Sequence, residues 1–187
     1  GTESCVGGGL SNTASGYIST VGGGVTNTAS GSVSTVAGGG NNDASGDAST
    51  VGGGYGNEAT ATLSTVGGGG NNDASADYAT IAGGGPSDPV SNPTTTNNRV
   101  TDDYGTIGGG GNNQAGDASG GTTDAIYATV GGGEENTASG YWSTVAGGYT
   151  NTASGGASTV GGGNGNTAGN GRSEEPRVGK AARSPRS

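Results

Sequence analysis

The segment STVGGGVTNTASG, residues 19–31, recurs along the chain with few changes and decides the fold. The Val or Ile before its glycines recurs every 15 residues, except for two intervals of 26 and 23 residues that contain insertions of 11 and 8 residues. A period this strict is typical of a solenoid, in which each unit packs only on its neighbours. Collagen is excluded, because glycine does not recur at every third position.

The composition excludes a conventional globular core. Of the 187 residues 47 are glycine, only 27% are hydrophobic, and Phe, Met and His are absent. A globular domain of this length is normally nearly half apolar. Low hydrophobicity with a net charge of -9 would indicate disorder in a random arrangement, but the regular placement of the residues argues for a repeat fold.

Each unit is expected to contain two short strands, because alternate residues of a strand share a face. The first stretch runs from Ile18 to Val21, and the second is NTAS at residues 27–30. The near-constant columns of Ser19, Val21, Asn27 and Ala29 predict the enclosed face, whereas the column of Thr28 varies in charge and predicts the solvent face. The expected fold is all-β: a narrow parallel β-solenoid or β-roll of ten 15-residue coils, about 48 Å long at roughly 4.8 Å per coil.

The predicted core ladder runs through the interior of this rod. Stacked Asn side chains are expected to hydrogen-bond from coil to coil; the alternative is that Asn only tolerates a left-handed turn. The ladder residues are Val21, Val36, Val51, Val66, Ile81, Ile107, Val130, Val145, Val160, Asn27, Asn42, Asn57 and Asn72.

The repeat domain is predicted to span residues 1–171, with insertions at 86–96 and 118–125, followed by a basic tail at 172–187. The insertions fall at opposite corners of the coil, and no proline interrupts a predicted strand. They are surface loops, either for binding or simply tolerated. The tail is expected to be disordered, the alternative being a functional basic arm. The acidic body argues against nucleic acid as a partner.

A stripe of aliphatic and aromatic residues is predicted on the outer face of nearly every coil. One Val and one Ala per coil offset little of the entropy lost on ordering the backbone, so a further apolar interface would help. Such a stripe indicates a protein interface in a symmetric oligomer; the alternative is an exposed ligand-binding stripe. The predicted interface residues are Ile18, Val33, Leu63, Tyr78, Tyr104, Tyr127 and Trp142.

The segments TASGYISTVGGGVTNTASG at 13–31 and TASGYWSTVAGGYTNTASG at 137–155 resemble the head repeats of trimeric autotransporter adhesins and haemagglutinin-like (YadA-like) proteins. The resemblance covers about residues 1–170. It implies a left-handed β-roll, a homotrimeric head and binding to a host surface or matrix. The repeat departs from the family pattern, since it has 15 residues and two or three glycines where the common repeat has nearer 14 residues and one glycine.

The chain begins inside a repeat at ESCVGGG, and it shows no heptad stalk, signal peptide or membrane span. We expect either a piece of a longer protein or a unit whose open end stacks on another copy, which would give a head-to-tail filament. Cys5 replaces the Thr of its column, and the alternative to that filling role is an intermolecular disulfide.

No enzymatic activity is expected. Without His the chain lacks Ser-His-Asp and Cys-His arrangements, and the glycine runs lack the Lys-Ser/Thr of a phosphate loop. No cofactor is expected either. Calcium is the one ion considered, with Asp43, Glu58 and Asp73 as candidate ligands, although the chain matches the calcium-binding nonapeptide of Gly-rich β-rolls only imperfectly.

The sequence thus predicts an extracellular or cell-surface protein of bacterial type, structural or adhesive, that binds copies of itself and a host or environmental surface. The alternative is an ice-binding β-solenoid that uses outward Thr ladders. Thr20, Thr35, Thr50 and their equivalents form one such ladder. Bulky Tyr and Trp near it and charged residues in the second array argue against this alternative.

Overall fold

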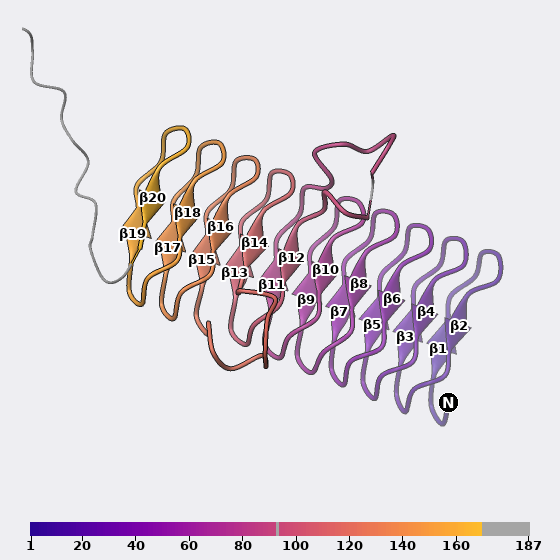
Figure 1. The fold of residues 1–187 in the computed structure, drawn as a ribbon. Coiled ribbons are helices and arrows are strands. Elements are labelled where there is room, and N and C mark those ends of the chain that lie inside the picture. The colour runs from indigo at the N-terminus through magenta and orange to yellow at the C-terminus, as the bar shows by residue number, and fades with distance from the viewer. Residues whose placement is uncertain (93, 170–187) are drawn as a thin grey trace, which may run out of the picture.

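A computed structural model describes residues 1–92 and 94–169, and in that part of the chain every regular element is a β-strand of two residues. The strands form two parallel ten-stranded sheets, one strand of each sheet per coil, stacked into a straight rod (Figure 1). The valine sheet comprises β1 (Cys5–Val6), β3 (Thr20–Val21), β5 (Thr35–Val36), β7 (Thr50–Val51), β9 (Thr65–Val66), β11 (Thr80–Ile81), β13 (Thr106–Ile107), β15 (Thr129–Val130), β17 (Thr144–Val145) and β19 (Thr159–Val160).

The alanine sheet runs along the other side of the rod. It comprises β2 (Thr13–Ala14), β4 (Thr28–Ala29), β6 (Asp43–Ala44), β8 (Glu58–Ala59), β10 (Asp73–Ala74), β12 (Arg99–Val100), β14 (Gln114–Ala115), β16 (Thr137–Ala138), β18 (Thr152–Ala153) and β20 (Thr167–Ala168).

Equivalent residues of neighbouring coils lie directly beside one another. Val21 pairs with Val36 in the valine sheet, and Ala29 pairs with Ala44 in the alanine sheet. The predicted all-β parallel β-solenoid is therefore confirmed. The basic tail at 172–187 lies outside the described residues.

The predicted strand from Ile18 to Val21 is wrong at its start. The strand holds only Thr20 and Val21, and Ile18 has a φ of 52° in a left-handed corner. The sequence concealed this corner because a β-branched residue is a strong strand former and rarely adopts positive φ.

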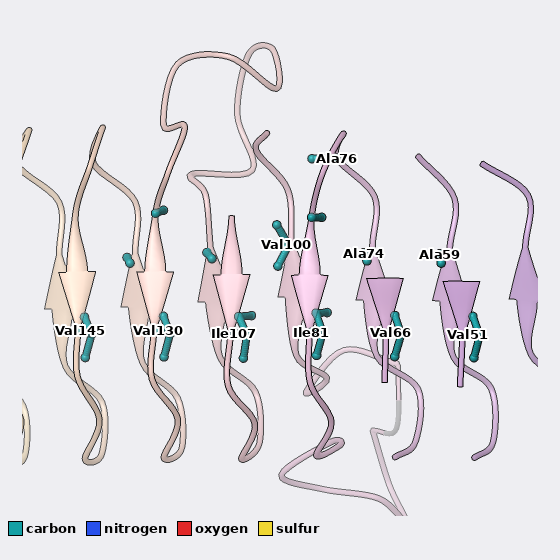
Figure 2. Packing of buried hydrophobic residues seen from close by; sticks show 14 of the residues in the cluster. Val51, Ala59, Val66, Ala74, Ala76, Ile81, Val100, Ile107, Val130 and Val145 are labelled. Carbon is teal, nitrogen blue, oxygen red and sulfur yellow. The ribbon is translucent and has the colours of Figure 1, made fainter. Parts of the chain in front are cut away.

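The interior is one line of aliphatic side chains from each sheet. Val51 and Ala59 of one coil, for example, are both fully buried, and the next coil repeats the pair with Val66 and Ala74 (Figure 2). The interior position of the alanine sheet is Ala in every coil except at Val100, so the two sheets lie close together. The predicted core residues Val21, Val36, Val51, Val66, Ile81, Ile107, Val130, Val145 and Val160 all lie in this interior.

A continuous asparagine ladder forms the polar half of the interior. The backbone N–H and side-chain Nδ2 of Asn57 both donate to Oδ1 of Asn42, at 3.0 and 3.2 Å. The same Nδ2 donates to the carbonyl of Gly53 in its own coil at 2.9 Å and of Gly69 in the next coil at 3.0 Å. Side-chain links of this kind join Asn12, Asn27, Asn42, Asn57, Asn72, Asn98, Asn113, Asn136, Asn151 and Asn166.

The glycine three positions after the buried Val or Ile of each coil accommodates this ladder. Gly69 has a φ of 89°, and a Cβ there would overlap the carbonyl oxygen of Gly84 and lie 2.9 Å from Nδ2 of Asn72. Only glycine adopts this conformation without strain and leaves room for the next coil. The preceding residue, Gly68, meets no such restriction, because the nearest atom to a Cβ there is 3.9 Å away.

We therefore predict that Gly69→Ala lowers the free energy of unfolding by about 2–4 kcal/mol, through positive φ and displacement of the ladder. Gly68→Ala in the same coil is the matched control and changes it by less than about 0.5 kcal/mol. Denaturant unfolding followed by circular dichroism measures both. Equal effects of the two substitutions would contradict this account of the glycine corner.

Candidate interaction surfaces

One corner of the coil carries an exposed apolar side chain in most repeats. From the second coil onward this corner column consists of Ile18, Val33, Ala48, Leu63, Tyr78, Tyr104, Tyr127, Trp142 and Ala157, all with φ between 52° and 61°. It includes every predicted interface residue. The side chains of these seven residues are between 41% and 56% exposed, so the structure places the predicted interface at the surface.

Three tyrosines of the corner column form a continuous stack. The ring of Tyr104 lies 4.6 Å from that of Tyr78 and 4.8 Å from that of Tyr127, in nearly parallel or slightly tilted planes. Partial desolvation within the stack, with a smaller contribution from the two neighbouring phenols, raises the pKa of Tyr104. The insertions between these coils do not interrupt the stack, because they enter the coils at other positions.

The outward face of the valine sheet is a threonine ladder. After Cys5, each of the nine following strands contributes one Thr, in register with its neighbours. Cys5 itself carries an exposed free thiol, and its backbone is in register with Thr20 of the neighbouring strand.

The outward face of the alanine sheet changes character along the rod. Thr13 and Thr28 begin this outer column, and Thr137, Thr152 and Thr167 end it, but the five central coils carry Asp43, Glu58, Asp73, Arg99 and Gln114. Arg99 donates from Nε to Oε1 of Gln114 at 2.8 Å. The central half of this face thus carries four charged residues and one amide, whereas both ends present hydroxyl groups.

The three carboxyl groups of this outer column are held in an unfavourable environment. Burial is the largest cause that raises the pKa of Glu58, and the adjacent charges of Asp73 and Asp43 raise it further. Burial also raises the pKa of Asp43 and of Asp73, against hydrogen bonds from Ser45 and Ser75 respectively. The carboxylate oxygen Oδ1 of Asp43 is buried without a hydrogen-bond partner among the described residues.

These three candidate calcium ligands do not converge on a point. Within the described ranges, the acidic side chains whose oxygens lie within 4.8 Å of one another are Asp102, Asp117 and Asp124. Sequence reasoning missed this group, because only folding brings Asp102 beside the second insertion.

Asp102 anchors that insertion. Its carboxylate accepts hydrogen bonds from the backbone N–H of Asp117 at 3.0 Å and of Ala125 at 3.2 Å, on either side of the loop. The side chain is fully buried. Burial is the largest cause that raises the pKa of Asp102, and contact with Asp124 raises it further while the backbone donors lower it.

A comparison with protein families bears on the last coils of the rod. The family model described as the Ubiquitous surface protein adhesin repeat matches residues 143–155. This segment is similar to an adhesin repeat. It comprises β17, the glycine corner, Asn151 and β18, and residues 19–31 differ from it at only two positions, Gly22 for Ala146 and Val25 for Tyr149. No curated protein matches the chain.

The matched repeat and the repetitive β-solenoid are consistent with a structural repeat protein of the adhesin-like kind. Within residues 1–92 and 94–169 the structure contains no helix with the length and apolar character needed to cross a membrane.

The strained carboxyl groups predict a pH-dependent gain of stability on Glu58→Gln. A raised folded-state pKa means that folding disfavours the charged form, so the folded state loses stability as pH rises through this pKa. The amide removes that cost and the repulsion from both neighbouring acids. We expect a higher thermal midpoint for the variant at pH 7.

The difference should vanish below about pH 4, where the native carboxyl group is protonated in folded and unfolded chains alike. Raising the salt concentration should reduce only the part due to neighbouring charges. Identical midpoints at pH 7, or a difference that persists at pH 3, would show that Glu58 is not under this strain.

Proposed function

We propose that this chain is an extracellular structural or adhesive repeat protein of a bacterial surface, and that it associates with copies of itself along the corner column. The observation that carries the proposal is the combination of positive φ with exposed apolar side chains. In a single chain this combination is unfavourable both for the backbone, because of the positive φ, and for the apolar side chains, because they are exposed to water.

The backbone cost comes first. A left-handed conformation costs a residue with a Cβ roughly 1–2 kcal/mol, and Gly or Asn would adopt it more readily. Ile18 and Val33 carry the further restriction of a branched Cβ. The chain nevertheless has Gly or Asn at none of the nine corner positions. A side chain retained despite strain favours a role outside the single coil.

The most suitable occupant of the corner column is another copy of the chain. The column repeats once per coil, and only a partner with the same spacing can match it over the whole rod. Two or more parallel rods would bury the stacked tyrosines and the aliphatic corners coil by coil. The homotrimer implied by the family resemblance satisfies this requirement, and a head-to-tail filament would use the sheet edges at the rod ends instead.

An adhesive role is supported by the repeat matched at residues 143–155. A rod of stacked coils holds its lateral faces in fixed register and presents them away from an attachment point. A host-surface or matrix ligand would then contact the faces that self-association leaves open.

Ice binding is the second candidate function, and the unbroken register of nine threonines on the valine sheet favours it. The strands are only two residues long and present one outward Thr each, so a second parallel rank of hydroxyls is missing from this face.

We predict that combined Tyr78→Asn, Tyr104→Asn and Tyr127→Asn substitution reduces the mass of the assembly, measured by light scattering after size exclusion, towards the 17.3 kDa of one chain. Asn suits positive φ, so the coils should remain folded by circular dichroism. Val90→Asn is the control, since Val90 is 89% exposed in the first insertion and lies outside the column. A folded triple variant of unchanged mass would refute self-association through this column, and so would a native chain that is itself monomeric.

The ice-binding candidate has a direct measurement. A native chain that separates the freezing and melting temperatures of a seeded ice crystal would establish it, and Thr65→Tyr, which breaks the ladder, should then reduce the separation. We expect no separation if adhesion is the function.

A further inference from the structure

The first insertion forms one wall of a polar pocket on the alanine sheet. The pocket has a volume of about 190 Å³ and lies where the loop of residues 86–96 meets coils that precede it in the chain. In Figure 1 this loop rises from the edge of the rod beside β10 and β12, whereas the second insertion lies at the opposite edge. The polar side chains that line the pocket belong to Asn41, Glu58, Asn71, Asp73, Thr94 and Asn97.

Two departures from the repeat meet at this pocket. Thr occupies the outer column at both ends of the rod, but acidic residues replace it at Glu58 and Asp73. The 11-residue insertion, which supplies Thr94, enters the neighbouring coil just before Asn97. The fold itself requires only the plain repeat. The occurrence of the acidic residues and the insertion at the same place therefore favours a binding site over neutral sequence change.

Two asparagine amides at the pocket differ in their roles. Asn97 lines the cavity, is 8% exposed and stands outside the asparagine ladder. Asn72 also lines the cavity, but its amide is saturated by the ladder, with bonds to Asn57, Gly68 and Gly84.

Glycine makes room for one of the lining groups. A Cβ at Gly56 would overlap Oδ1 of Asn71, so the Asn71 amide extends across the neighbouring coil at the pocket wall. The wall therefore combines donors and acceptors of Asn amides and a Thr hydroxyl with the acceptor oxygens of two carboxyl groups.

The arrangement does not suit a single metal ion. Among the described residues, Glu58 and Asp73 belong to no group of three acidic side chains whose oxygens all lie within 4.8 Å of one another. Polar groups spread around a cavity, rather than converging on a point, match a ligand with several hydroxyl groups. The negative lining disfavours anionic ligands.

We propose that this pocket binds a neutral saccharide residue, whose hydroxyls donate to Glu58 and Asp73 and exchange hydrogen bonds with Asn71, Asn97 and Thr94. The inference rests on the proposed adhesive function, for which it names a ligand class. It assigns recognition to the first insertion and the charged coils, and leaves the corner column to self-association.

The test is binding of the fluorescently labelled chain to a printed array of neutral, sialylated and sulfated oligosaccharides. We expect signal on neutral glycans and little on the anionic ones. Deletion of residues 86–96 restores the 15-residue period and should reduce that signal at least tenfold. Deletion of residues 118–125 restores the period equally and is the matched control, with binding retained.

Point variants refine the test without relying on the loop. Asn97→Ala and Glu58→Gln should each weaken binding at least fivefold, and the second is expected to fold more stably than the native chain. The proposal is overturned by an array without neutral-glycan binding, or by full binding after deletion of residues 86–96. It is also overturned if calcium chloride alone raises the thermal midpoint of the native chain but not of Glu58→Gln, since the pocket would then be a cation site.

The two proposals fail separately. A triple tyrosine variant that is monomeric but still binds glycans supports the pocket independently of assembly. A native chain that assembles but binds no neutral glycan overturns the pocket and leaves self-association standing.

Discussion

The whole rod depends on one shared acceptor, the Oδ1 atom of an asparagine that receives two N–H donors from the next coil. Hydrophobic burial alone is thin here, with one Val or Ile and one small residue per coil. The amide ladder stabilises the stack along the axis and satisfies corner carbonyls that a narrow interior would otherwise leave unpaired. The positive-φ glycines and the absence of larger interior side chains follow from the space that this ladder requires.

Much of this architecture could be predicted from the sequence because the repeat makes each column visible. The 15-residue period predicted the coil. The columns of Val21 and Asn27 are nearly constant and were predicted to face inward, whereas the column of Thr28 varies and was predicted to face solvent. The position of Ile18 was mispredicted, because strand propensity and a left-handed corner make opposite demands and the residue type revealed only the first. Asp102 and Asn97 escaped prediction for another reason. Both stand in repeat columns, but their roles depend on contacts with the insertions, whose conformation the repeat does not predict.

The surfaces divide the rod into regions with different physical requirements. The corner column is apolar, strained and periodic, which suits a periodic partner. The central alanine sheet is charged and irregular, with carboxyl groups whose burial opposes folding at neutral pH. Stability and binding therefore place opposite demands on Glu58, a conflict common at functional sites.

The asparagine ladder continues across both insertions. Asn98 donates to Asn72 at 3.1 Å across a separation of 26 residues, much as Asn57 donates to Asn42 across 15. The stacking of one coil on the next thus does not depend on how many residues are inserted at the corner. Gain or loss of whole 15-residue units would alter the length of the rod in fixed steps without disturbing any coil that remains, so length and recognition can change in evolution independently of each other.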